Sequence, residues 1–114
     1  MISLGLDTYA VISHMVDKNL IHARAPNDKF NNIDLCGGLF SGTGASFRGK
    51  IYADLVEEIT NVSLYSEYIE PSVVSNMHDD LKTHIHKDDD PEIIELVKFF
   101  RVCKDNGYGL IGWW

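Results

Sequence analysis

Cysteine, proline and long apolar runs are scarce in this 114-residue chain, which contains two cysteines and three prolines. Cys36 and Cys103 lie far apart and form no CxxC pair, which excludes a cysteine-rich scaffold. A single disulfide between them is one interpretation. We expect instead two buried thiols in a reducing cytosol, and therefore a cytoplasmic protein.

The longest apolar runs span about four residues, whereas a membrane-spanning helix needs roughly 20. The chain also lacks the basic flank and apolar core of a signal peptide, a low-complexity tract, and a repeat of solenoid period. Its hydrophobic fraction of 45% is enough for a core without metal or disulfide support. We therefore expect one compact domain, residues 1–114, with no membrane association.

Basic residues are outnumbered, with 10 Lys and Arg against 17 Asp and Glu and a formal charge of −7. The imbalance lies in residues 51–114, which carry −8, whereas residues 1–50 carry +1. Direct nucleic-acid binding is disfavoured, because it needs cations that replace the counterions of phosphate. The charge fits either a merely soluble surface or association with a basic partner.

Alternation of apolar residues in 2–6 predicts a short strand. Asp7 or Thr8 is then expected to cap a helix that reaches about Lys18. A continuing strand is an alternative, because the Tyr, Val and Ile residues that follow favour sheets. A second strand is predicted over 33–40, where it leads into a glycine-rich segment.

A helix is predicted over 47–60, with an apolar stripe of Ile51, Leu55 and Ile59 at four-residue spacing and with Tyr52 and Val56 alongside it. Its carboxylates are placed on the solvent face: Asp54, Glu57 and Glu58. Residues 63–69 are expected to form either a turn of helix or a short extended link.

Two further helices and a terminal strand have clearer boundaries. Pro71 is placed for a first helical position, and the sequence Asp90-Pro91-Glu92 supplies a cap, an N1 proline and an acid in order. Asn106-Gly107 is a typical C-terminal signal. The apolar end of the chain, 108–114, is expected to be a strand tucked into a sheet. The fold class predicted is α+β: a short, mainly antiparallel sheet packed against three to four helices.

Residues 37–50 hold five of the nine glycines, and residues 44–50 fit the GxxxxGK pattern of phosphate-binding loops. Ile51 replaces the expected Ser or Thr that binds Mg²⁺, and Phe47 adds bulk to the loop, so we exclude nucleotide hydrolysis. Two interpretations remain: a glycine-rich turn, with Arg48 pairing to an acid, or an anion site near a helix N-terminus. The candidate ligand-binding residues of that site are Gly44, Ser46, Arg48 and Lys50.

His and Asp residues gather between His78 and Asp90, but their spacing matches neither HExxH nor a calcium loop. Cys103 falls on the apolar face of the last helix, which indicates an inert core thiol. We therefore predict no metal, no cofactor and no catalytic residues.

The function predicted is that of a small, acidic, cytoplasmic binding protein of inhibitor, immunity or adaptor type. It would associate with a basic protein such as a toxin or nuclease, because acidic patches speed association with basic partners. The predicted partner-binding residues are Asp79, Asp80, Asp88, Asp89, Trp113 and Trp114. The alternative function is binding of a small anion or nucleotide by residues 37–50.

Overall fold

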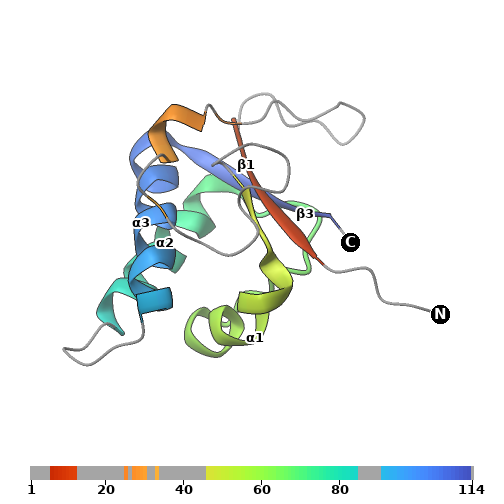
Figure 1. Ribbon diagram of the computed structural model, residues 1–114, viewed down its shortest axis with the longest axis vertical. Helices are drawn as coiled ribbons and strands as arrows, with labels where there is room; N and C mark the ends of the chain where they lie inside the picture. Colours follow the sequence, from red (N-terminus) through yellow and green to blue (C-terminus); the bar gives the residue numbers. More distant parts are fainter. Residues whose placement is uncertain are drawn as a thin grey trace.

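The computed structural model describes residues 6–12, 25, 27–30, 33, 46–84 and 91–113 (Figure 1). The side chains of residues 27, 28, 92 and 113 are not among the described parts. The described residues form three strands, three α-helices and one short 3-10 helix. In chain order these are β1 (Asp7–Ile12), η2 (Asn27–Phe30), β2 (Ser46–Phe47), α1 (Gly49–Thr60), α2 (Pro71–Thr83), α3 (Pro91–Asn106) and β3 (Tyr108–Trp113).

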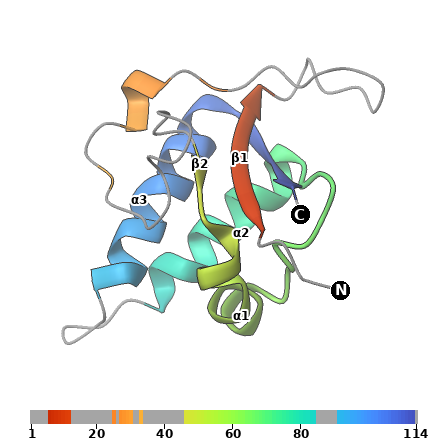
Figure 2. The same ribbon diagram turned by 45° about the vertical axis from the view of Figure 1, so that its right-hand side comes forward.

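The strands form an antiparallel sheet in the order β2-β1-β3, with β1 in the middle (Figure 2). The register is described by the partners of Tyr9, which lies opposite Ser46 of β2 and opposite Ile111 of β3. The prediction of an α+β fold with a mainly antiparallel sheet is confirmed. The tucked terminal strand is also confirmed, since Leu110 and Ile111 are buried in β3.

The N-terminal prediction was wrong in its boundaries. The chain from Asp7 to Ile12 is a strand, not the start of a helix, and the alternative of a continuing strand was correct. The physical reason is non-local: β1 is paired on both sides, which adds to the sheet preference of its aromatic and β-branched residues. Of the strand predicted over 33–40, only Ile33 lies within the described residues. Ser46–Phe47 forms the third described strand, so the helix predicted from Phe47 begins at Gly49.

The helices α2 and α3 begin at the predicted prolines, and α3 ends at the predicted Asn106. Pro71 occupies the first turn of α2, where its missing N–H costs nothing. Gly107 has φ +70° at the end of α3, the left-handed conformation that a C-terminal glycine adopts without strain. Asn61 ends α1 in the same conformation, with φ 63°.

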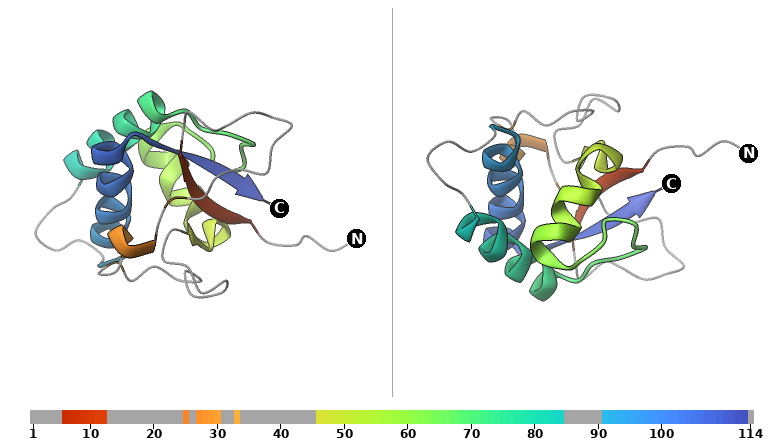
Figure 3. Two further views of the ribbon diagram at one scale, coloured as in Figure 1. Left: turned by 90° about the horizontal axis from the view of Figure 1, so that it is seen from above. Right: turned by 90° about the horizontal axis from the view of Figure 1, so that it is seen from below.

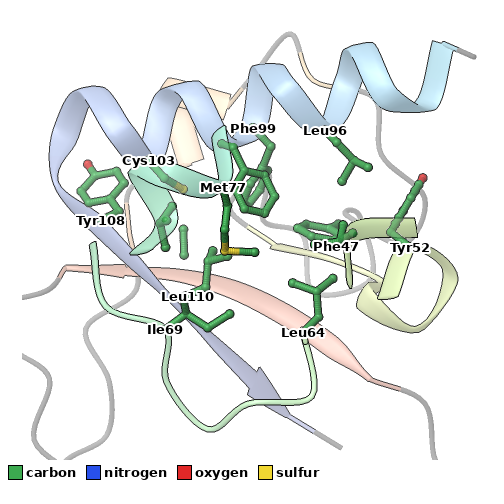
Figure 4. Packing of buried hydrophobic residues seen from close by; sticks show 14 of the residues in the cluster. Phe47, Tyr52, Leu64, Ile69, Met77, Leu96, Phe99, Cys103, Tyr108 and Leu110 are labelled. Carbon is green, nitrogen blue, oxygen red and sulfur yellow. The ribbon is translucent and has the colours of Figure 1, made fainter. Parts of the chain in front are cut away.

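The core lies between one face of the sheet and the helices α2 and α3 (Figure 3). Aromatic rings occupy its centre: Phe99 lies 4.7 Å from Phe30 and 4.9 Å from Phe47, measured between ring centroids. Met77 of α2 and Leu110 of β3 point into the same cluster (Figure 4). Cys103 is a buried free thiol, as predicted. Cys36 lies outside the described residues.

The link between α1 and α2 is extended and covers the outer edge of β3. Ile69 and Leu110 exchange two backbone hydrogen bonds, and the Gly112 N–H donates to the Ser66 carbonyl at 2.9 Å. Gly112 permits this approach, because a Cβ there would lie 2.6 Å from the Leu64 carbonyl oxygen. The extended interpretation of this segment is therefore confirmed.

Candidate interaction surface

The glycine-rich segment is described only from Ser46 onward, so Gly44 lies outside the described residues. Ser46 is a buried residue of β2. Arg48 places its Nε 2.9 Å from Oδ1 of Asp7, so its charge already has an acidic partner, as the turn interpretation predicted. Lys50 is exposed, and its backbone N–H donates to the carbonyl of Leu6 at 3.0 Å.

Gly49 brings the first turn of α1 into direct contact with β1. A Cβ at this position would collide with Oγ1 of Thr8 and would lie 3.0 Å from Cδ2 of Leu6. The second glycine of the GxxxxGK pattern therefore permits close packing of a helix on a strand. The described part of the segment joins β2 to α1 and packs α1 against the sheet.

Among the predicted partner-binding residues, Asp79 already interacts with other side chains of this protein. Its Oδ1 accepts a hydrogen bond from Lys104 Nζ at 2.7 Å and lies 3.0 Å from Nδ1 of His78. Lys104, and then His78, hold the pKa of the Asp79 carboxyl below its usual range. Asp80 is exposed at the solvent face of α2. Asp88, Asp89 and Trp114 lie outside the described residues, and only the backbone of Trp113 is described, opposite Asp7.

Two carboxylates of α3, Glu95 and Asp105, also have basic partners within the helix. Glu95 pairs with Lys98 at 2.8 Å, and Asp105 pairs with Arg101 at 3.1 Å. These pairs span three and four residues, the spacings at which helical side chains are neighbours. The basic residues of α3 are thus already paired with acids of this chain.

The acids of α1 differ from the paired acids Asp79, Glu95 and Asp105. Asp54, Glu57 and Glu58 are exposed, and none of them takes part in an ion pair among the described residues. Lys50 lies four residues before Asp54, yet no ion pair joins them in this part of the chain. The solvent side of α1 therefore presents carboxylates without an internal cation, at one end of the molecule (Figures 1 and 2).

The predicted apolar stripe lies at the edge of this same face, and Ile51 departs from the prediction because it is 51% exposed. Leu55 and Ile59 are partly buried and pack against the core. Tyr52 and Val56, predicted alongside the stripe, are buried and face the core. Gly49 supplies the reason: its contact with β1 sets the rotation of the helix, and the buried positions follow it at helical spacing.

We call this surface the α1 face and define it by Ile51, Asp54, Leu55, Glu58 and Ile59. Sequence reasoning noted its carboxylates but not its exposed apolar row. The sequence did contain one signal of it. The apolar residues of α1 cover a wider part of the helix surface than is needed to pack one face against the core.

Groups suited to catalysis or metal binding are not assembled in the described part of the chain. No three His, Cys, Asp or Glu side chains come together there as metal ligands. Burial raises the pKa of the Cys103 thiol far above its usual range, which keeps it neutral and a poor nucleophile. His78 is a buried residue of α2 and contacts Asp79.

Comparison of the chain with protein-family models, with curated proteins and with solved structures gives no match in any of the three. Among the described helices, none combines the length and the apolar character needed to cross a membrane.

Proposed function

We propose that this protein is a small acidic binding protein of inhibitor, immunity or adaptor type. It associates with a basic protein through the α1 face and performs no catalysis. The observation that carries the proposal is the contrast between acids that are paired within the chain and the exposed acids of α1. Asp79, Glu95 and Asp105 each have a basic partner in the chain, whereas Asp54 and Glu58 have none among the described residues.

Unpaired carboxylates suit recognition for a physical reason. A partner cation that approaches Asp54 or Glu58 does not compete with an internal salt bridge, so its full attraction is available. The formal charge of −7 adds long-range steering of a basic partner toward the chain. Ile51, exposed beside these acids, supplies apolar area that can be buried on contact.

The partner class that fits is a basic protein such as a toxin or a nuclease, bound in the cytoplasm. The free thiol of Cys103 supports a reducing compartment. The alternative of anion binding gains less support, because Arg48 is paired with Asp7 and Ser46 is buried.

Charge reversal on α1, compared with charge reversal at two other exposed acids, tests the proposal. Tagged wild type, the variant Asp54→Lys with Glu58→Lys, and a control with Glu67→Lys and Asp80→Lys would be used for capture from host cells. Both variants change the charge equally, and all four acids are exposed. A basic protein that binds wild type and the control, but binds the α1 variant at least about tenfold more weakly, is the expected result.

Thermal unfolding of each variant would first establish that it is folded. Equal capture by all three proteins would overturn the proposal. Equal loss with both variants would assign binding to net charge rather than to the α1 face. Loss with the control alone would move the binding surface to Glu67 and Asp80, of which Asp80 is a partner-binding residue predicted from the sequence.

A further inference from the structure

We infer that the α1 face receives an amphipathic helix of the partner whose basic side chains flank an apolar row. The inference rests on the proposed function and specifies which element of the basic protein makes the contact. Its starting point is the apolar row formed by Ile51, which is exposed, and by Leu55 and Ile59, which are partly buried.

The row has the geometry of a helix-packing ridge. Its members are four residues apart, so it runs along α1 for about 12 Å, with steps of about 6 Å. Rows of this i±4 kind are the ridges that fit the grooves of a second helix. Exposure is greatest at Ile51, at the first turn of α1, and smaller at Leu55 and Ile59, which touch the core.

The charges lie on one side of the row only. Asp54 and Glu58 border it toward solvent, whereas Tyr52 and Val56 border it toward the core. A complementary element therefore needs an apolar row with Lys or Arg along one flank. That arrangement is the pattern of a basic amphipathic helix.

A helix fits this surface better than an extended segment does. The α1 face offers side chains and no free backbone edge, because the amides of a helix interior are bonded within the helix. An extended peptide pressed against Ile51 would bury backbone N–H and C=O groups without partners, which is unfavourable. A helix satisfies its own backbone and contributes only side chains.

A second copy of this chain fits the α1 face less well than a basic helix does. Facing two α1 helices would bring Asp54, Glu57 and Glu58 of each copy together, with Lys50 as the one exposed cation of each helix. Like charges in contact oppose association. The face is therefore assigned to a partner of opposite charge.

The test uses two synthetic 18-residue peptides of identical composition. One places leucines at helical i, i+4 and i+8 positions with lysines along one flank; the other distributes the same residues so that no row forms. Affinity would be measured by fluorescence anisotropy at two salt concentrations, and contacts by amide chemical shifts of the labelled full chain. The patterned peptide should bind at least about tenfold more tightly, with shifts concentrated in α1.

Matched variants separate the apolar and the ionic contributions. Ile51→Ser should weaken binding of the patterned peptide by about tenfold, in line with the loss of one buried apolar side chain. Ile94→Ser removes another exposed isoleucine, on α3 and 39% exposed, and should leave binding unchanged. Ile51→Leu should restore most of the affinity.

Two outcomes would overturn the inference. One is equal affinity for both peptides, including the absence of binding by either; the other is a chemical-shift map centred away from α1. If Asp54→Lys with Glu58→Lys abolishes capture of the native partner while Ile51→Ser has no effect on it, the proposed function stands and the helical contact fails. If capture survives the charge reversal, the proposed function itself fails.

Discussion

Lys104 Nζ lies 2.7 Å from Asp79 Oδ1, so one carboxylate oxygen joins the last turn of α3 to α2. The same oxygen lies 3.0 Å from Nδ1 of His78. These bonds favour the ionised carboxylate and hold its pKa below the ordinary value of 3.8. The stability that they contribute is therefore full above about pH 5 and is lost as the pH falls through the lowered pKa.

We predict that Asp79→Asn lowers the thermal midpoint at neutral pH, and that its difference from wild type shrinks as the pH falls through the lowered pKa of Asp79. Circular dichroism melts between pH 2 and 7 would measure the difference. Asp80→Asn is the matched control, because Asp80 is the next residue, is exposed, and has no ion pair among the described residues. A gap between wild type and Asp79→Asn that does not shrink as the pH falls would contradict the assignment.

Gly49→Ala is expected to destabilise the protein, although alanine is the better helix former. Helix propensity alone favours Ala over Gly by about 1 kcal/mol. The added Cβ meets Oγ1 of Thr8 and the side chain of Leu6, and such overpacking costs about 1–3 kcal/mol. Urea unfolding would give the net free energy of unfolding.

A double-mutant cycle with Thr8→Ala isolates the contact. Removing the hydroxyl vacates the space that the new Cβ needs, so Gly49→Ala should cost less in the Thr8→Ala background. Additive effects of the two changes would show that Thr8 does not limit the approach of α1 to β1.

The helices could be predicted from local signals, whereas the rotation of α1 could not. Pro71, Pro91 and Gly107 restrict or permit particular backbone conformations at their own positions. The helix ends that they mark can therefore be predicted from the sequence. For α1, two neighbouring stripes are both apolar, and the choice between them depends on the contact of Gly49 with Thr8. That contact joins residues 41 positions apart and has no local signature.

The candidate site was missed for the same reason. The carboxylates of α1 were predicted on the solvent face and are found there, but Ile51 was predicted in the core and is 51% exposed. Pairing of Asp79 with Lys104 across α2 and α3 likewise follows from tertiary packing. Charge counting alone could not separate paired acids from unpaired ones.

Gly112→Ala should loosen the link that covers the edge of β3. The added Cβ would lie 2.6 Å from the Leu64 carbonyl oxygen and 2.8 Å from that of Ser66, and backbone atoms have little room to move. We expect a loss of about 1–3 kcal/mol in the free energy of unfolding. Amide exchange at Gly112 should accelerate, because its N–H donates to Ser66. Gly107→Asn is the control and should change little, since Asn tolerates the positive φ at that open position.

His78→Leu should leave stability within about 1 kcal/mol of wild type, although His78 is 3% exposed. Its Nε2 is buried without a hydrogen-bond partner among the described residues, so the imidazole carries an uncompensated desolvation cost there. Leucine removes that cost and fills a comparable volume, while Asp79 keeps its bond to Lys104. Leu81→Ala, one turn further along α2 and fully buried, should lose about 2–5 kcal/mol and calibrates the assay. Urea unfolding of both variants measures the two losses. A loss above about 2 kcal/mol for His78→Leu would mean that Nε2 makes a stabilising contact that the described residues do not contain.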